Sequence, residues 1–529
     1  MPAANSRRRF LQTGASAALG TSLAPFSGSA RESTPDDDLT TVSIIHTTDL
    51  HGHIRPAVNY DGIGNVGGFA RCATLIREWK RQNPNHLLVD AGDLYQGTHV
   101  SRRNRGKLMM KLLNAFNYNG WVLGNHEFDW GIDPVADALS AAEMPALGAN
   151  LDLDEATVPK DKVQRSHIET VDGFRIGFFG LTTPGLPYWL NPKLLDGISA
   201  TDPAAAAKAA IAEMKSEKEA PHAVISVGHM GTKNGQDDYA NRAHDTMDTN
   251  DEIEVFIAGH THRDFSSYYL NGKIYTQSAY WGINLGRIDL TFSKSKNALI
   301  DKRAFTVFMD RRFEMDPLVL QMAKDEIEAS EEELAREIGK LSVALDGNYE
   351  RGKPNGHERL IAAAISHSLA KKKVKVDAVF HGPFSEEEIQ PQNFTVSDVW
   401  EIIPYENMVV TADLKVRDVV TILEEAMNSS RYTNRNLIGL DVQLEGKRGD
   451  YKVVDILDPE KKKPLKPDDT ITVAFNSYDA QSGGRRLMEL RGLIEEPSSR
   501  SRLHELETRE CLIDFFLDKQ SVSDDDLVV

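Results

Sequence analysis

Side chains that commonly bind divalent metals occur in five short, glycine-containing segments of the chain. They comprise carboxylates, imidazoles and one carboxamide, with no thiolate: Asp49, His51, Asp93, Asn125, His229, His260 and His262. Such mixed nitrogen and oxygen ligands favour Mn²⁺, Zn²⁺ or Fe over soft ions. The set is too large for one ion and fits two divalent ions that share a bridging ligand, for which Asp93 is the candidate. Two adjacent metals can clamp the attacking and leaving oxygens of a displacement at phosphorus.

Each segment follows a short apolar run that predicts a buried strand. These runs lie at residues 42–46, 86–90, 121–123, 223–227 and 255–258. Ligands in open α/β sheets gather beyond the carboxyl ends of the strands, so we expect the five clusters to converge. A neighbouring glycine allows each strand to end in a sharp turn. Asp49 and His51 are two residues apart, and we expect them to face one side of an extended segment, as for His260 and His262.

The five segments resemble, in type and order, the motifs of calcineurin-like metallophosphoesterases. The likeness extends to the family of 5′-nucleotidases, UDP-sugar hydrolases and 2′,3′-cyclic phosphodiesterases, whose members add a C-terminal domain. It covers about residues 40 to 520. The resemblance implies two metal sites that share Asp93. The first would use Asp49, His51, Asp93 and His262, and the second would use Asp93, Asn125, His229 and His260.

The same resemblance implies that His126 and Asp129 form a catalytic dyad. In this interpretation a cationic His126 contacts the phosphoryl oxygens or the leaving group, and Asp129 orients its ring and raises its basicity. A metal-bound hydroxide would attack phosphorus. Glu127 lies inside the same segment, and the sequence assigns it no direct role.

The first thirty residues have the features of an export signal rather than of a folded segment. Consecutive arginines at 7–9 precede Phe-Leu, a mild apolar stretch and a small-residue cleavage site at 28–30. This pattern is typical of a twin-arginine (Tat) signal peptide over residues 1–30 and predicts a periplasmic or secreted protein that uses the Tat export machinery. The apolar stretch is too short for a stable membrane span.

The charge balance argues against some classes of partner. The formal net charge of the chain is −18, and loss of residues 1–30 removes three arginines and no acidic residue, which makes it −21. Nucleic acid polymers and anionic membranes are therefore poor candidates. A small anionic phosphate ester remains compatible, because bound metals create a local positive field. The two cysteines, Cys72 and Cys511, leave open whether a disulfide forms.

The length and element pattern predict more than one domain in an α/β protein. The resemblance implies a four-layer metallophosphoesterase β-sandwich flanked by helices at 40–305 and a linker helix at 315–345. A smaller α+β substrate domain of the 5′-nucleotidase type would follow at 346–520, and we expect residues 521–526 to fray. In the linker region, apolar residues recur at helical spacing, which is also compatible with a helix packed on the first domain.

The predicted substrate domain departs from the family pattern at specific positions. An arginine-containing segment is replaced by 381–384, and an expected aromatic ring is missing at 438–441. Tyr478 is a candidate to stack on a base, an interaction worth about 1–3 kcal/mol. Arg359 and Arg485 are candidates to bind the substrate anion, because arginine is well shaped for phosphate. Surface ion pairs are the competing interpretation for both arginines.

The leading hypothesis is an exported two-metal hydrolase that acts on nucleotides or related small phosphate esters. A second hypothesis keeps the scaffold and changes the substrate to a non-nucleotide phosphate or a sulfur-oxyanion ester, as in the similar thiosulfohydrolases. A third is a metal-dependent binding protein without activity, against which the His126–Asp129 pair argues. The substrate, the native metals and the oligomeric state stay open at this stage.

Overall fold

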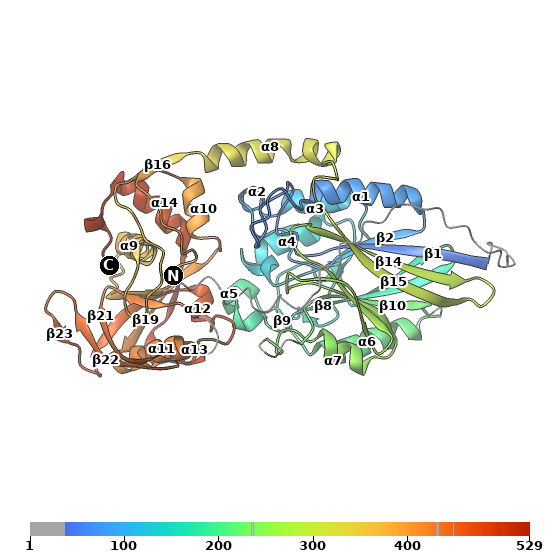
Figure 1. The fold of residues 1–529 in the computed structure, drawn as a ribbon. Coiled ribbons are helices and arrows are strands. Elements are labelled where there is room, and N and C mark those ends of the chain that lie inside the picture. Colours follow the sequence, from blue (N-terminus) through green and yellow to red (C-terminus); the bar gives the residue numbers. More distant parts are fainter. Residues whose placement is uncertain (1–37, 219, 234, 236, 430–432, 448) are drawn as a thin grey trace.

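The structure is a computed structural model that describes residues 38–529, except 219, 234, 236, 430–432 and 448. The predicted signal peptide at 1–30 lies outside the described residues. The chain forms two domains side by side, and helix α8 (Pro317–Leu334) runs from one to the other (Figure 1). Within the described part of the chain, no helix is both long and apolar enough to span a bilayer.

The N-terminal domain contains two stacked mixed sheets. The first has the order β15 (Ala298–Phe308), β14 (Asn284–Ser293), β1 (Leu39–Thr47), β2 (His86–Asp90), β3 (Gly120–Val122), β4 (Ala146–Leu147) and β6 (Val163–Gln164). The second has the order β12 (Asp264–Leu270), β13 (Lys273–Ser278), β11 (Ile253–Ala258), β10 (Ala223–His229), β8 (Phe174–Thr182) and β7 (Ser166–Val171). Strands β1, β2 and β3 are parallel neighbours, as are β8, β10 and β11, so their carboxyl ends share one edge.

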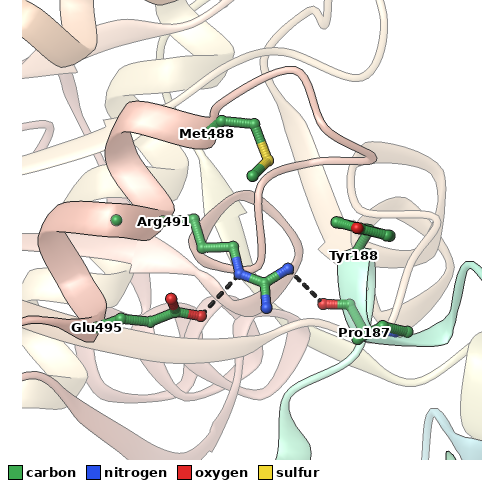
Figure 2. A pocket seen from close by; sticks show the side chains of 6 residues that line it. Pro187, Tyr188, Met488, Arg491 and Glu495 are labelled. Carbon is green, nitrogen blue, oxygen red and sulfur yellow. Dashed lines mark hydrogen bonds and ion pairs between the residues drawn. The ribbon is translucent and has the colours of Figure 1, made fainter.

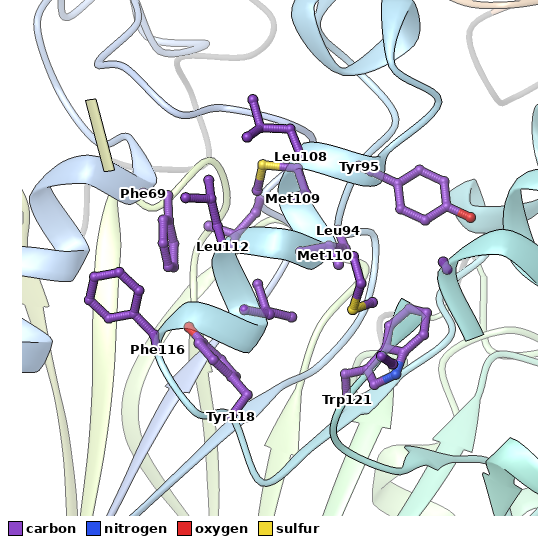
Figure 3. Close-up of a cluster of buried hydrophobic side chains, with 14 of the residues drawn as sticks. Phe69, Leu94, Tyr95, Leu108, Met109, Met110, Leu112, Phe116, Tyr118 and Trp121 are labelled. Carbon is purple, nitrogen blue, oxygen red and sulfur yellow. The ribbon is translucent and has the colours of Figure 1, made fainter. Parts of the chain in front are cut away.

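Both faces of each sheet are buried, which explains the continuous apolar runs in the sequence. In β1, Val42 and Ile44 pack between the two sheets, while Ile45 packs beneath the outer helices. Helices α1 (Phe69–Gln82), α3 (Lys107–Ala115) and α4 (Ile132–Ala141) cover the first sheet, and α6 (Pro203–Ser216) and α7 (Ala243–Thr249) cover the second. Figure 3 shows Phe69 of α1 near Leu112 of α3, with Trp121 of β3 below. The predicted four-layer fold is confirmed.

The linker helix is shorter than the expected 315–345. Asp316 caps its start by accepting hydrogen bonds from the Leu318 and Val319 N–H groups, and the helix ends at Leu334. Residues Glu337–Leu341 instead form strand β16, which pairs with β18 (Gln392–Thr395) and β26 (Ser521–Val522). A shift in the pairing register after Glu337 buries Ile338 and Leu341. Ile338 lies four residues after Leu334, so this strand residue continued the helical spacing in the sequence.

The C-terminal domain is built on a mixed sheet of order β20 (Asn436–Ile438), β17 (Ala378–His381), β24 (Thr470–Asn476), β19 (Met408–Lys415) and β25 (Arg502–Glu507). Helices α9 (Gly356–Lys371), α10 (Val396–Ile402) and α14 (Thr508–Lys519) contribute to the core on one face, and α11 (Val416–Asn428) and α13 (Met488–Glu495) to the core on the other. A hairpin of β21 (Asp441–Lys447) and β22 (Asp450–Asp458) extends from it, with β23 (Lys463–Pro464) alongside.

Residues 521–526 do not fray, contrary to expectation. Val522 in β26 pairs with β16 and is fully buried, and a short 3₁₀ turn follows at Asp524–Asp526. Burial of Leu527 in the same core anchors this end of the chain. Cys72 and Cys511 are both buried free thiols, one in each domain, so they form no disulfide here.

Candidate metal centre

The predicted ligands lie at the carboxyl edge of the two sheets: His229 is the last residue of β10, and the others lie on loops that follow β1, β2, β3 and β11. These loops are tied together by backbone hydrogen bonds. The Asp49 N–H donates to Gly92 O and the His51 N–H donates to Asp93 O, each at 2.9 Å. The Gly259 N–H reaches across to Gly228 O at 3.1 Å. These hydrogen bonds hold ligands that are distant in the sequence close together at one edge of the sheets.

The side chains gather into two groups that share Asp93. One group contains Asp49, His51, Asp93 and His262, and the other contains Asp93, His229 and His260. Within each group the candidate ligand atoms all lie within 4.8 Å of one another. Asn125 joins the second group, because its Oδ1 lies 2.8 Å from His260 Nδ1. The structure therefore brings together all of the candidate ligands that the sequence singles out.

The protonation pattern of the histidines fits a cation between these side chains. His51 Nδ1 donates to Gln96 O at 2.8 Å, which leaves its Nε2 lone pair directed at His262 Nε2, 3.0 Å away. His229 Nδ1 donates to Ala91 O at 2.7 Å, so its buried Nε2 faces an oxygen of Asp93, 3.0 Å away. Lone pairs that face one another in a buried site repel unless a proton or metal ion lies between them.

Burial keeps part of the ligand set neutral. It lowers the pKa of His51 and of His260 to about 3, so both rings can offer a lone pair at neutral pH. Burial also lowers the pKa of His229, but the Asp93 carboxylate outweighs it and raises the pKa to about 9. A proton therefore occupies His229 in the absence of a metal, and binding of a cation would displace it.

The ligand loops are not extended, contrary to the sequence-based expectation. Asp49 and His51 have φ values of 49° and 48°, and His260 and His262 have 74° and 55°. Asp93, at 53°, is also left-handed. Left-handed backbone is unfavourable for residues with a Cβ and costs on the order of 1 kcal/mol each. The alternation argument for the paired ligands is therefore wrong, because tight left-handed turns rather than an extended strand direct them inward.

The glycines beside the ligands allow close packing as well as turns. A Cβ on Gly124 would lie 2.2 Å from Asp93 Oδ1, and one on Gly92, whose φ is +93°, would lie 2.8 Å from His229 Nδ1. Any larger residue at either position would displace a ligand. The glycine pattern in the sequence thus reflects how tightly the metal loops approach each other.

Glu127 has a structural role that the sequence reasoning missed. Its fully buried carboxylate accepts hydrogen bonds from the N–H groups of Asp93 at 2.9 Å, Leu94 at 2.7 Å and Gly124 at 2.6 Å. Burial and the neighbouring Asp93 raise its pKa to about 8, while the N–H donors oppose that rise. Glu127 therefore fixes the backbone that carries the bridging ligand. In the sequence, the only feature that could have indicated this role was the position of the glutamate directly after Asn125 and His126.

His126 and Asp129 form a close pair at the edge of this site. The two residues lie on one short 3₁₀ turn, and His126 Nδ1 is 2.7 Å from Asp129 Oδ2. Burial lowers the pKa of His126, but the carboxylates of Asp129 and Asp93 reverse this and raise it to about 10. The His126 side chain stays 30% exposed, so its other ring nitrogen is available to a bound molecule. The pair can present an oriented, cationic donor.

Aromatic rings around the ligands form a second group that the sequence did not reveal. The Trp189 ring lies 5.0 Å from His260, and the Tyr280 ring stacks on His262 at 5.1 Å. Tyr60 stacks on both Tyr280 and His262. These rings come from loops without a motif, and ring contacts of this kind depend on tertiary structure that local sequence does not encode.

The C-terminal domain contacts the N-terminal domain near the site. Gln96, whose carbonyl orients His51, donates from Nε2 to Glu406 at 2.5 Å, and Glu406 pairs with Arg509 at 2.6 Å. Glu406 and Arg509 are both almost fully buried. A second contact joins Gly484 N–H to Tyr188 O at 3.1 Å. In Figure 2, Arg491 donates to Pro187 O and pairs with Glu495 beside a pocket at this second contact.

Two of the three predicted substrate-binding residues, Tyr478 and Arg485, lie near one loop of the C-terminal domain. Tyr478 is half-buried, and its hydroxyl accepts a hydrogen bond from Arg486 at 3.2 Å. Arg485 is exposed, with its guanidinium 5.3 Å from the centre of the Tyr188 ring in the other domain. Arg359 pairs with Asp524 at 2.7 Å. Within the described residues, no hydrogen bond or ion pair joins Arg359 to the metal ligands.

The chain matches two family models in succession. Residues 42–264 match the calcineurin-like phosphoesterase model, and residues 337–490 match the 5′-nucleotidase C-terminal domain. Endonuclease YhcR of Bacillus subtilis is 24% identical over 90% of this chain, which spans only 40% of that relative. A 5′-nucleotidase of Vibrio cholerae is 26% identical over 88% of this chain and 90% of its own length.

Solved structures share the fold. A 5′-nucleotidase precursor from Thermus thermophilus superposes with a TM-score of 0.66 at 23% identity, covering 92% of this chain and 97% of that one. The sulfate thiohydrolase SoxB from Thermus thermophilus has a TM-score of 0.60 at 17% identity, and the match covers 95% of this chain and 96% of that one. The two domain matches, the fold and the two ligand groups that share Asp93 all point to the same family. The chain therefore belongs to the calcineurin-like phosphoesterases that carry a 5′-nucleotidase C-terminal domain, a family of metal-dependent phosphoester hydrolases.

Proposed function

We propose that this protein is a two-metal phosphoesterase that hydrolyses nucleotides or related small phosphate esters and releases inorganic phosphate. The observation that carries the proposal is the pair of ligand groups joined through Asp93, with the His126–Asp129 pair beside them. Divalent metals held there would supply Lewis-acid activation of water and of the phosphoryl group. The donors are imidazole, carboxylate and amide groups, so we propose Mn²⁺, Zn²⁺ or Fe.

The residues of the chain would divide the remaining tasks. His126, oriented by Asp129, would donate a hydrogen bond to a phosphoryl or leaving-group oxygen through its accessible Nε2. Asp93 would serve as a ligand in both metal sites, and its backbone N–H donates a hydrogen bond to Glu127. His51 would keep Nε2 for the metal because its Nδ1 donates to Gln96 O.

The C-terminal domain would supply substrate contacts. Arg485 is the better placed of the predicted arginines, because it lies at the contact between the domains and is exposed. Tyr478 offers a ring near the same loop. The assignment of Arg359 stays a prediction, since Asp524 already pairs with its guanidinium. Export by the Tat pathway to the periplasm or beyond likewise stays a proposal that rests on the arginine pattern of residues 1–30.

A substrate panel tests the proposal. Residues 31–529 loaded with Mn²⁺ or Zn²⁺ should release phosphate from AMP, and Asp93→Asn should abolish this release because it breaks both ligand groups. The panel adds UDP-glucose, 2′,3′-cyclic AMP, glycerophosphate and bis-p-nitrophenyl phosphate, with a coupled phosphatase to reveal diester cleavage. Activity on none of them would contradict the proposal.

A second candidate keeps the metal chemistry and changes the substrate to a non-nucleotide phosphate or sulfur-oxyanion ester. The observation in its favour is the segment His381–Phe384, where Gly382 leaves no room for a side chain because a Cβ would lie 1.7 Å from Asn434 O. No arginine extends from this segment. Hydrolysis of generic or sulfur esters in preference to every nucleotide would favour this candidate over the first.

A further inference from the structure

A hairpin at the rim of the metal centre carries exposed apolar side chains. Residues 57–66 close through paired hydrogen bonds between Ala57 and Val66 at 2.9 and 3.1 Å. Inside the turn, Asn59 Oδ1 accepts from the N–H groups of Asp61 and Ile63, which fixes its shape. Its three large apolar side chains are nevertheless more than half exposed: Val58 at 61%, Tyr60 at 62% and Ile63 at 51%. An ordered turn thus holds apolar surface beside the ligands.

Tyr60 is the member of this hairpin nearest to the metal ligands. Its ring is almost parallel to that of His262, with centroids 5.9 Å apart and planes at 11°. Tyr280 completes the array, at 4.6 Å from Tyr60 and 5.1 Å from His262. The Tyr280 hydroxyl accepts a hydrogen bond from the Tyr60 N–H at 3.2 Å, so backbone and ring are held together. Tyr60 therefore has a fixed orientation while much of its surface stays open to solvent.

The C-terminal domain places a second tyrosine close to the first. Tyr405 is 49% exposed, and its ring lies 5.7 Å from that of Phe384. Burial and the Tyr405 hydroxyl both raise the pKa of Tyr60. The turn that carries Tyr405 is anchored beside the metal site by the Gln96–Glu406 hydrogen bond. Aromatic surface from both domains therefore borders the same region.

We propose that Tyr60 is a specificity-determining residue that stacks on a planar, uncharged part of the leaving group, such as the base of a nucleoside, in the ester held at the metal centre. Tyr405 lies where it can contribute to the same subsite from the other domain. The proposal rests on the proposed function and specifies its substrate class. A flat partner suits this site, because the exposed ring of Tyr60 is held with its plane at 11° to the His262 ring and 29° to the Tyr280 ring. The negative charge of Asp61 in the same turn disfavours an anionic partner.

This subsite also accounts for a gap in the C-terminal domain. The 438–441 segment lacks an aromatic ring, so Tyr478 has no stacking partner there. The ring of Tyr60 would offer a base a stacking face beside the metal ligands instead. Base stacking on an aromatic side chain tolerates different bases, because every base has a π face. We therefore expect broad tolerance among nucleobases and discrimination against esters that have no planar group.

A pair of substrates that differ only in the base isolates the contribution of Tyr60. AMP and ribose 5-phosphate share the sugar and phosphate, so kcat/KM is measured for both with the wild type, Tyr60→Ala and Tyr60→Phe. We expect Tyr60→Ala to lower kcat/KM for AMP about tenfold, at the low end of a base–aromatic stack, with less than about a twofold change for ribose 5-phosphate. Tyr60→Phe should retain most of the AMP preference, because it keeps the ring.

Tyr269→Ala is the matched control, since this tyrosine is 57% exposed on β12 and contacts no metal ligand among the interactions of the described residues. It should leave both substrates unchanged. Equal losses for AMP and ribose 5-phosphate in Tyr60→Ala, or no loss for either, would overturn the inference. If the wild type released phosphate from no ester, the proposed function would fail. Adenosine binding by calorimetry, which Tyr60→Ala should weaken about tenfold, would then still test the subsite.

Discussion

The position of the bridging carboxylate depends on Glu127, and the substitution Glu127→Gln tests this dependence. One carboxylate oxygen, Oε2, accepts from the N–H groups of Asp93 and Gly124, and Oε1 accepts from Leu94. A glutamine side chain has a single oxygen, so it can accept hydrogen bonds at the Oε1 position or at the Oε2 position, but not at both. Its amide nitrogen then faces at least one backbone N–H, which is left without an acceptor in a site that water does not reach.

The expected magnitude follows from these three bonds. Above pH 8, where Glu127 is ionised, losing one hydrogen bond to the charged acceptor and leaving one buried donor unpaired costs about 2–4 kcal/mol, with relief of repulsion from Asp93 acting in the opposite direction. Release of the backbone at Asp93 and Leu94 also loosens the bridging ligand. Substitutions that disturb the support of metal ligands commonly lower metal affinity by about 10- to 100-fold. We expect Glu127→Gln to show both effects.

Calorimetric titration with Mn²⁺ and urea unfolding of the metal-free protein measure these two effects separately. Glu143→Gln is the control, because Glu143 is an exposed acid of the same domain whose side chain has no metal contact. The reasoning is refuted if Glu127→Gln binds Mn²⁺ within about twofold of the wild-type affinity and also unfolds at the wild-type urea concentration.

Four further outcomes are expected. Arg509→Ala should lower the free energy of unfolding by about 3–5 kcal/mol in urea melts, because it leaves the buried Glu406 carboxylate without its cation. His126→Ala should lower kcat for phosphate release by about 10²- to 10⁴-fold while metal content by mass spectrometry stays unchanged. Chelation should lower Tm and abolish phosphate release, and Mn²⁺ should restore both, because the ions bind only the folded site. Burial lowers the pKa of His381 to about 4 from 6.5, so the unfolded state binds more protons between these values. Stability should therefore fall as the pH drops from 6.5 toward 4, and urea midpoints of His381→Gln should show a smaller fall over that range.

The N-terminal fold was accessible from sequence because both faces of its sheets are buried. Runs such as Val42–His46 and Ala223–Val227 are mostly apolar, and each is followed by a glycine-containing polar segment. The carboxyl ends of parallel strands meet at one edge, which is why side chains on separate loops could be expected to converge. The ligand positions depend on this topology rather than on local conformation.

Features that depend on tertiary contacts escaped the sequence. The left-handed backbone of Asp49 and His51 is imposed by hydrogen bonds to the neighbouring loop, so an extended model of that segment was wrong. The linker helix was drawn too long because Ile338, a buried residue of strand β16, lies four residues after Leu334 and so continues the helical spacing. Tyr60 carries no motif, and its relation to His262 appears only when the hairpin folds over the site.

The central claim is that two divalent ions share Asp93 and that both are needed for catalysis. The most direct test titrates metal-free protein with Mn²⁺ while phosphate release from AMP is followed. The account predicts that the wild type binds two ions per chain and becomes active only as the second site fills. Asp93→Asn should bind at most one ion tightly and release no phosphate. Full activity with a single bound ion, or undiminished activity of Asp93→Asn, would contradict the account.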